Sequence, residues 1–325
     1  DELEKILCAK AREGVEVKII FDDFGNIKRF SGETIDRLCE VGVEVFIFNP
    51  VHEYVNRLHF NYRDHRKIAC IDGDVAYTGG VNIADEYANL IERFGYWKDS
   101  GVCLEGEGAW GLTASFIRMC VNLGGVMHNE HDYYRPHTPV KSEGFCQPFT
   151  DGPQNNPDNP AEDVFLQMIS GARRFLYITT PYFIPDESLM RALCIAGDGG
   201  VDVRLMLPGK PDHWYADCVA ESYFGELIKH GVKVYRYIPG FLHGKSIMVD
   251  REAAFVGSAN MDYRSFELDY ECGVMVYSAP MIESLLEDMD MIVDRSHLVT
   301  AEEWAKRSVL HRVFEPLLRL FAIWM

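Results

Sequence analysis

The chain has 325 residues, of which 47% are hydrophobic and 25% are charged. This composition is typical of a globular protein and excludes a disordered tail, a coiled coil and a collagen-like repeat. Acidic residues outnumber basic ones by 50 to 32, and the formal charge of −18 argues against a surface built to bind nucleic acid.

The chain contains nine scattered cysteines and no C-x2-C pair, which favours reduced thiols in a cytosol over disulfides or structural zinc. No stretch approaches the roughly 20 apolar residues of a spanning helix, and the first residues carry no signal-peptide pattern. The sequence as given therefore predicts a soluble or peripheral protein. Its cysteines are Cys8, Cys39, Cys70, Cys103, Cys120, Cys146, Cys194, Cys218 and Cys272.

The predicted elements repeat along the chain. Residues 1–21 and 186–207 share an acidic helix start, an apolar stripe, a glycine and an alternating strand. The strand predicted at 42–48 corresponds in the same way to that at 231–237, and a helix precedes each. Strands that alternate with helices predict an α/β fold of two similar halves, with mixed sheets flanked by helices.

The two copies begin differently. A helix over 163–170 and an apolar strand over 175–183 precede the second copy, whereas nothing precedes Asp1. We therefore expect the chain to begin inside its first half, which would lack about 25 residues or more. The Gly-, Pro- and Asn-rich stretch 149–159 predicts a linker between halves at 1–148 and 160–325. The amphipathic segment Ser308–Met325 predicts a C-terminal helix that packs on the core or lies on a bilayer surface.

A motif of His, Lys and Asp occurs once in each half. Its spacing is H-x-K-x4-D, an asparagine follows 17 residues after the histidine, and a single copy is a weak signal. Two copies inside an already repeated framework are a strong one. The residues are His65, Lys67, Asp72 and Asn82 in the first half, and His243, Lys245, Asp250 and Asn260 in the second.

Strand periodicity predicts how these side chains meet. Residues two apart on a strand project from one face, so His65 and Lys67 share a face. The Asp72–Gly73 pair predicts a turn, and folding the chain back there brings Asn82 opposite His65. The second motif folds in the same way. Both aspartates also suit a turn for purely structural reasons.

The residue types indicate phosphate chemistry. Two lysines buried near each other are unfavourable unless an anion lies between them, and a phosphate is the obvious one. One neutral imidazole can attack phosphorus while a second, protonated imidazole on the opposite side donates to the departing oxygen. Lysines and asparagines would hold the non-bridging oxygens, so the scheme uses no metal and no cofactor. Two in-line displacements predict net retention at phosphorus.

A nucleophilic histidine needs an acceptor that fixes its tautomer. Glu271, in a strand after the second motif, is expected to serve the second hairpin, and Asp99, which opens an apolar strand, the first. The alternative is that both are exposed carboxylates at strand ends.

Two segments of the chain resemble the paired HKD motifs of the phospholipase D superfamily. They are HRKIACIDGDVAYTGGVNIADEY and FLHGKSIMVDREAAFVGSANMDYRSFELDYE. The order of NYRDHRKI, YWKD, TPYFIPDESLMRAL and VRLMLPGKPD is similar to that of the bacterial cardiolipin synthase branch. The resemblance covers nearly the whole chain. It implies two phospholipase D-like halves packed with pseudo-twofold symmetry.

The resemblance also implies a reaction, a substrate and a location. Two phosphatidylglycerol molecules would give cardiolipin and glycerol through a phosphohistidine at a cell membrane, with His65 as nucleophile and His243 as general acid and then base. Lys67, Lys245, Asn82 and Asn260 would bind the phosphate, while Asp99 and Glu271 would orient the histidines. The alternatives are a phosphodiesterase of the same superfamily that hydrolyses lipid or nucleic acid, and a binding protein with an inactive site. The oligomeric state is left open.

Two further groups of residues are weaker candidates. His128, His131 and His137 are metal-binding residue types, but no carboxylate or cysteine completes a zinc spacing. Tyr182, Phe183 and Trp214 would line a lipid-facing entrance or belong to the core, and the core is the simpler expectation.

Overall fold

The computed structural model describes residues 2–26, 31–51, 60–128, 133–141, 144–308 and 318–319. The C-terminal helix predicted over Ser308–Met325 therefore falls almost entirely outside the described residues. Among the helices described, none combines the length and the apolar character needed to cross a bilayer.

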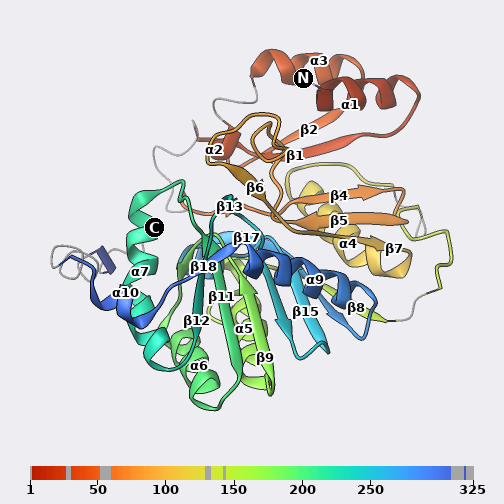
Figure 1. Cartoon of the computed structure of the whole chain (residues 1–325). Coiled ribbons are helices and arrows are strands. Elements are labelled where there is room, and N and C mark those ends of the chain that lie inside the picture. Colours follow the sequence, from red (N-terminus) through yellow and green to blue (C-terminus); the bar gives the residue numbers. More distant parts are fainter. Residues whose placement is uncertain are drawn as a thin grey trace.

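The second half forms one large mixed sheet (Figure 1). Its strand order is β18-β12-β11-β9-β14-β15-β17, with β8 and the short β3 of the first half also paired to β17. Strands β9, β11 and β12 run parallel to one another. Strand β14 is antiparallel to β9 and β15, and β15 is antiparallel to β17. Strands β10 and β16 pair with each other, and β13 pairs with β6 of the first half, outside the large sheet. The strands from residue 145 onward are β8 (Phe145–Asp151), β9 (Phe175–Thr179), β10 (Phe183–Ile184), β11 (Asp202–Pro208), β12 (Lys233–Tyr237), β13 (Gly240–Leu242), β14 (Ser246–Val249), β15 (Ala253–Gly257), β16 (Met261–Asp262), β17 (Asp269–Tyr277) and β18 (Ser296–Leu298).

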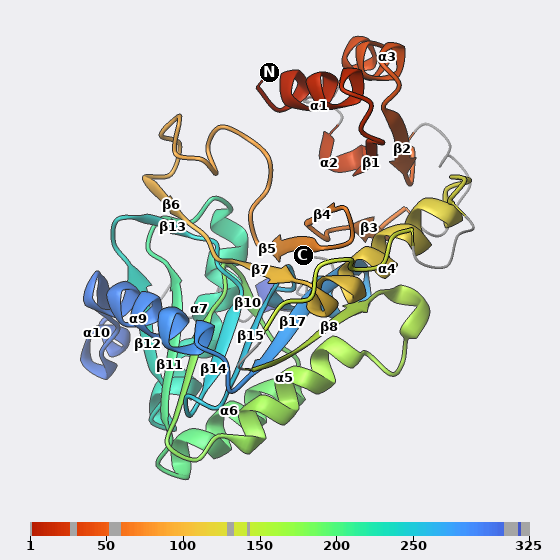
Figure 2. The same cartoon turned by 90° about the vertical axis from the view of Figure 1, so that its right-hand side faces the viewer.

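Helices cover both faces of this sheet, with α5 and α6 on one face and α9 on the other (Figure 2). The alternation along β9 explains why two cores form, because Leu176 and Ile178 belong to one core and Tyr177 to the other. Full burial of a side chain such as Leu193 contributes about 2 kcal/mol. The helices are α5 (Pro160–Gly171), α6 (Glu187–Asp198), α7 (Trp214–Lys229), α8 (Tyr263–Glu267), α9 (Met281–Asp294) and α10 (Ala301–Ala305).

The first half repeats this arrangement in two separate sheets. Parallel strands β1 and β2 match β11 and β12, and the antiparallel sheet β4-β5-β7 matches β14-β15-β17. In the second half β9 joins the two parts, and the described residues of the first half contain no strand in that position. The elements are α1 (Glu2–Arg12), β1 (Lys18–Asp22), α2 (Asp23–Asn26), α3 (Gly32–Glu40), β2 (Glu44–Phe48), β3 (Arg63–Asp64), β4 (Ile68–Ile71), β5 (Val75–Gly79), β6 (Tyr96–Lys98), β7 (Gly101–Glu105) and α4 (Glu107–Asn122).

The stretch 149–159 predicted as a linker overlaps the end of a strand. Residues 149–151 are the end of β8, which pairs along its whole length with β17, and a 3-10 turn follows at Pro153–Asn155. The second half's sheet thus begins at Phe145.

Candidate active site

Both predicted hairpins form. Strand β4 pairs with β5 in the register Ile68↔Thr78, and β14 pairs with β15 in the register Ser246↔Val256. Asp72 and Asp250 occupy matching turn positions with φ of 53° and 54°. This left-handed conformation suits Asp, Asn and Gly in tight hairpin turns.

The turns lie at the ends of the hairpins opposite the histidines. Asp250 is seven residues beyond His243, a distance of about 20 Å along an extended chain. Its carboxylate accepts the backbone N–H groups of residues 173–175 at 2.8–2.9 Å, which ties the hairpin to the start of β9. Asp72 is exposed at its turn. The structure therefore gives Asp250 a structural contact at its turn. A catalytic role of Asp72 and Asp250, as members of the two motifs, stays a prediction.

His65 forms the first histidine–carboxylate pair. Its Nδ1 lies 2.8 Å from Glu271 Oε1. His65 directly follows β3, which runs parallel to β17 with Asp64 opposite Tyr270, and the His65 N–H donates to the Tyr270 carbonyl. The register therefore places Glu271 next to His65.

His243 forms the second pair by the same construction. It directly follows β13, which runs parallel to β6 with Leu242 opposite Lys98. The His243 N–H donates to the Lys98 carbonyl at 2.6 Å, and its Nδ1 lies 2.7 Å from Asp99 Oδ2. Each histidine thus follows a short strand of its own half that pairs with a strand of the other half.

The pairing is crossed relative to the expectation. Asp99 was expected beside His65 and Glu271 beside His243, whereas each carboxylate faces the histidine of the opposite half. The reason is the pair of two- and three-residue parallel contacts, β3 with β17 and β6 with β13, which are too short to give a sequence signal. The two halves therefore complete each other's sites.

The lysines repeat one local geometry. Lys67 Nζ donates to the His65 carbonyl at 2.5 Å, and Lys245 Nζ donates to the His243 carbonyl at 2.6 Å. Burial lowers the pKa of both ammonium groups, that of Lys245 to about 7, and each lysine's positive charge lowers the pKa of the other half's histidine. This coupling shows that both motifs meet in one region. A buried and a half-buried lysine in that region favour a bound anion.

Burial also sets the protonation of the histidine pairs. It lowers the pKa of His243 to about 4, helped by the charge of Lys245, and it lowers the pKa of His65 despite Glu271. Burial raises the pKa of Glu271 and of Asp99, but the histidine and lysine charges more than offset this and leave both pKa values below their usual range. Both histidines are therefore neutral, and both carboxylates ionised, at neutral pH.

Sequence reasoning missed the hydroxyl that holds one of these carboxylates. Ser258 Oγ donates to Glu271 Oε2 at 2.5 Å and accepts the Cys272 N–H at 3.0 Å. Gly80 lies close to the other pair: a Cβ added there would lie 2.3 Å from Asp99 Oδ1 and 2.9 Å from the His243 carbonyl. The glycine makes room for the crossed pair itself.

An aromatic wall distinguishes the two histidines. The rings of Tyr87, Trp97 and Phe241 lie 5.3–5.7 Å from the His243 ring, between ring centroids. The His65 side chain is 27% exposed and that of His243 is 7% exposed. The sequence signal for this wall is the aromatic residues next to each motif, as in YWKD and GFLHGKS. His65 is thus the more accessible imidazole.

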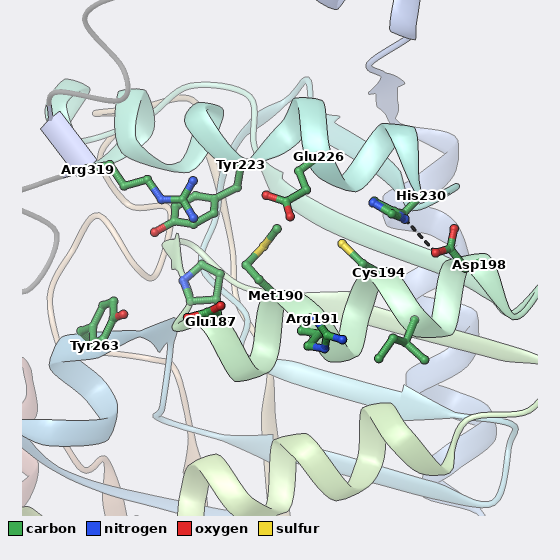
Figure 3. A pocket seen from close by; sticks show the side chains of 12 residues that line it. Glu187, Met190, Arg191, Cys194, Asp198, Tyr223, Glu226, His230, Tyr263 and Arg319 are labelled. Carbon is green, nitrogen blue, oxygen red and sulfur yellow. Dashed lines mark hydrogen bonds and ion pairs between the residues drawn. The ribbon is translucent and has the colours of Figure 1, made fainter.

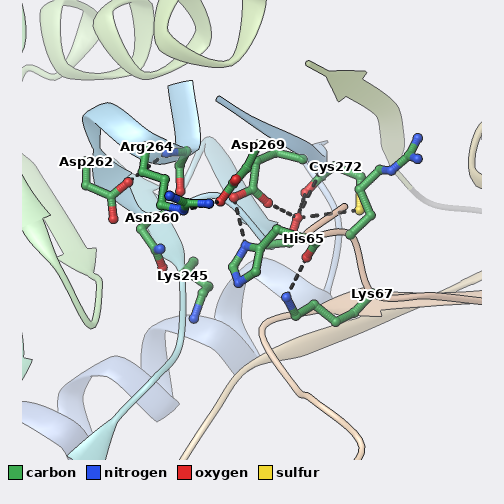
Figure 4. Close-up of polar contacts among 12 residues, drawn as sticks. His65, Lys67, Lys245, Asn260, Asp262, Arg264, Asp269 and Cys272 are labelled. Carbon is green, nitrogen blue, oxygen red and sulfur yellow. Dashed lines mark hydrogen bonds and ion pairs between the residues drawn. The ribbon is translucent and has the colours of Figure 1, made fainter. Parts of the chain in front are cut away.

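The asparagines end the two hairpins. Asn260 is buried, and its Oδ1 has no hydrogen-bond partner within the described part of the chain (Figure 4). It follows β15 three residues after Gly257, whose N–H donates to the Lys245 carbonyl. Asn82 follows β5 and is half-buried.

Of the weaker candidates, Tyr182 adjoins the aromatic rings around His243, with its ring 6.4 Å from that of Phe241 between centroids. His128 stacks on Tyr133 at 3.9 Å and lies 3.4 Å from Glu16, while His131 is not among the described residues. Phe183 is fully buried in the core, as expected, whereas Trp214 is 63% exposed. The aromatic triplet therefore does not form one surface.

One cavity in the described structure is separate from these side chains. It measures about 620 Å³, lies between α6 and α7 and is lined by residues that include Arg191, Cys194, Tyr223 and His230 (Figure 3). None of the histidine, lysine or carboxylate residues of the two motifs lines it. The polar side chains converge elsewhere.

Comparison with known proteins agrees with this geometry. A family model described as "Cardiolipin synthase, PLD-like domain" matches residues 1–92 and 165–293, which contain both motifs. The chain is 38% identical over 323 residues to a cardiolipin synthase of Halalkalibacterium halodurans, covering 99% of this chain and 64% of that protein. It is 37% identical over 326 residues to a cardiolipin synthase of Listeria welshimeri, covering 99% and 67%.

A solved structure shares the fold at low sequence identity. The phosphatidylserine synthase of Haemophilus influenzae has a TM-score of 0.64 at 14% identity, covering 99% of this chain and 90% of that one. The chain spans 62–69% of the length of the curated relatives it matches. The family match over both halves and the identity to these relatives lead to one conclusion: this chain belongs to the cardiolipin synthase family of phospholipase D-like proteins.

Proposed function

We propose that this chain transfers a phosphatidyl group from one phosphatidylglycerol to another, giving cardiolipin and glycerol. The observation that carries the proposal is the crossed pair of histidine–carboxylate contacts, together with the buried Lys245 and the half-buried Lys67. Relatives named cardiolipin synthase at 37–38% identity support the choice of lipid substrate. The membrane supplies that substrate, so the proposal includes action at a cell membrane.

In the first step His65 attacks phosphorus. Glu271 holds Nδ1, so the lone pair of the neutral imidazole is on Nε2, which forms the new P–N bond. His65 is assigned this role because it is the more exposed imidazole. The bond from phosphorus to the glycerol headgroup oxygen breaks, and that oxygen takes a proton from His243 as glycerol leaves.

His243 needs a proton for that step, although its pKa is about 4 in the free chain. A phosphodiester bound between Lys67 and Lys245 brings a negative charge, which offsets the lysine charges that lower the histidine pKa values. The bound substrate thus favours the protonated form of His243 that the first step uses.

In the second step the headgroup hydroxyl of another phosphatidylglycerol loses its proton to His243 and attacks phosphorus, and the P–N bond to His65 breaks. Lys67, Lys245, Asn82 and Asn260 are proposed to bind the non-bridging oxygens in both steps. The reaction exchanges one phosphodiester and alcohol for another such pair. It therefore uses no nucleotide.

The test supplies phosphatidylglycerol labelled in its headgroup, in vesicles without nucleotide. Formation of cardiolipin with stoichiometric release of labelled glycerol supports the transferase. Phosphatidic acid without cardiolipin would instead indicate a lipid hydrolase, and cleavage of DNA without lipid turnover a nuclease. His65→Ala and His243→Ala are the matched inactive controls.

A further inference from the structure

Asp269 is a buried acid next to the site that the proposed steps do not use. It lies two residues before Glu271 on β17, so both side chains project from the same face of the strand. Asp269 is 6% exposed. A ring nitrogen of His65 and one carboxylate oxygen each of Asp269 and Glu271 all lie within 4.8 Å of one another. A second carboxyl group therefore stands beside the imidazole that Glu271 contacts (Figure 4).

The two carboxyl groups differ in their partners. Glu271 contacts the His65 ring and accepts the Ser258 hydroxyl. Asp269 Oδ2 lies 3.3 Å from Arg264 Nε, whereas Asp269 Oδ1 is buried without a hydrogen-bond partner among the described residues. An ionised carboxylate with one bare buried oxygen is unfavourable.

The charges around Asp269 come from four directions. Glu271 on β17 and Asp262 at the end of β16 are acidic, whereas Arg264 on α8 and Lys67 after β3 are basic. Burial is the largest influence and raises the pKa of Asp269 well above its usual value, and Glu271 and Asp262 act in the same direction. Neighbouring carboxyl groups in a buried place cannot all ionise. Arg264 does not reverse this, because its contact with Asp269 is long at 3.3 Å, its guanidinium also donates to the Asn61 carbonyl, and its side chain is 33% exposed.

A cation could in principle share these three side chains. The ammonium groups of Lys67 and Lys245 act on His65 electrostatically, and their charges oppose a metal ion there. A proton bound to one of the two carboxylates neutralises its charge and, unlike a metal ion, places no cation near the two lysines.

We propose that Asp269 is a positioning residue that stays a neutral carboxylic acid beside His65, so that Glu271 is the ionised partner of the imidazole. This inference rests on the proposed role of His65 as the nucleophile. A second negative charge at this place would raise the affinity of His65 for protons and repel the phosphate, and both effects oppose attack on phosphorus. Holding one proton on Asp269 avoids them.

The first test compares amide substitutions at the two carboxyl groups. Asp269→Asn keeps the shape and the neutral state, so we expect kcat at pH 7 within about 3-fold of the native chain. Glu271→Gln removes the required charge and is expected to lower kcat by about 100-fold or more. A loss in Asp269→Asn as large as that in Glu271→Gln would overturn the proposal.

The second test reads the protonation state without activity. Nuclear magnetic resonance of the chain with ¹³C-labelled aspartate should show a carboxyl carbon that stays protonated at pH 7 and is lost in Asp269→Asn. The pKa of His65, followed on its ring, should be unchanged in Asp269→Asn and altered in Glu271→Gln. The proposal fails if every aspartate is ionised at pH 7, or if Asp269→Asn lowers the pKa of His65. Should the variant not fold, the native spectrum alone decides.

A third readout uses stability. Because the folded pKa of Asp269 is raised, its stabilising contribution is present at low pH and is lost as pH rises from about 4 towards the folded pKa. The unfolding constant of the native chain should therefore rise relative to that of Asp269→Asn by up to about tenfold per pH unit in this window. A constant ratio would contradict the proposal. The resonance and unfolding measurements do not depend on cardiolipin formation. The proposal for Asp269 and the proposed transferase function can therefore fail independently.

Discussion

Glu271 lies 206 residues beyond His65 in the sequence, and its Oε1 lies 2.8 Å from Nδ1 of that histidine. Asp99 and His243 repeat the relationship across 144 residues in the opposite direction. Each half therefore supplies a histidine and the carboxylate that contacts the other half's histidine. Neither half holds a complete site on its own.

Removing either carboxylate charge should impair catalysis strongly. Asp99→Asn leaves the size of the side chain unchanged but cannot stabilise an imidazolium at His243, so we expect kcat to fall about 10²- to 10⁴-fold. The KM for phosphatidylglycerol should change little, because Asp99 does not bind the lipid. Steady-state kinetics on vesicles measure both. An effect below 10-fold would show that the crossed contact does not orient His243.

The hydroxyl of Ser258 should matter through Glu271. Ser258→Ala removes the donor to Glu271 Oε2 and leaves the carboxylate free to rotate, so kcat should fall about 10-fold. In the Glu271→Gln background the same change should have much less effect, because the two residues act as one unit. Full additivity of the two losses in a double-mutant cycle would argue against this link.

The buried lysine predicts a pH-dependent stability. The pKa of Lys245 is about 7 in the folded chain and about 10.4 when unfolded, so between these values the unfolded chain binds a proton that the folded chain does not. Stability should therefore rise by a few kcal/mol from pH 7 to pH 10. In Lys245→Met, the free energy of unfolding measured with urea should increase less from pH 7 to pH 10 than in the native chain. The exposed Lys229→Met is the matched control and should keep the native slope.

Asp250 should affect the stability of the fold. Asp250→Ala leaves three backbone N–H groups without their acceptor, so the free energy of unfolding should drop by about 3 kcal/mol. Asp72→Ala, at the exposed matching turn, removes no such acceptor and should lower it by only about 1 kcal/mol, the cost of alanine at a positive φ. Urea unfolding compares the two. Equal losses in both variants would contradict the different surroundings of the two aspartates.

Local pattern predicted the hairpins and the clustering of the motifs, because strand alternation and turn residues are encoded within a few positions. The registers Ile68↔Thr78 and Ser246↔Val256 follow directly from the turns at Asp72 and Asp250. The strong apolar run at 175–183 likewise predicted the central strand β9, although the strand ends at Thr179.

Long-range pairing could not be predicted in the same way. Strands β3 and β13 have only two and three residues, and their composition does not indicate which distant strand they join. The choice between Asp99 and Glu271 as partner of His65 depends on those contacts alone. The hydroxyl of Ser258 and the ring of Tyr87 were missed for the same reason, since each acts on a residue brought in by tertiary packing.

The most direct test of the account is to trap the covalent intermediate. His243→Ala and His65→Ala are each mixed with ³²P-labelled phosphatidylglycerol, quenched with base, and digested for mass spectrometry of the phosphorylated peptide. The account predicts an acid-labile label on His65 in His243→Ala, formed slowly without the His243 proton but retained because no base activates the second hydroxyl, and no label in His65→Ala. Protein that forms cardiolipin in its native form but never carries label on either histidine would contradict it.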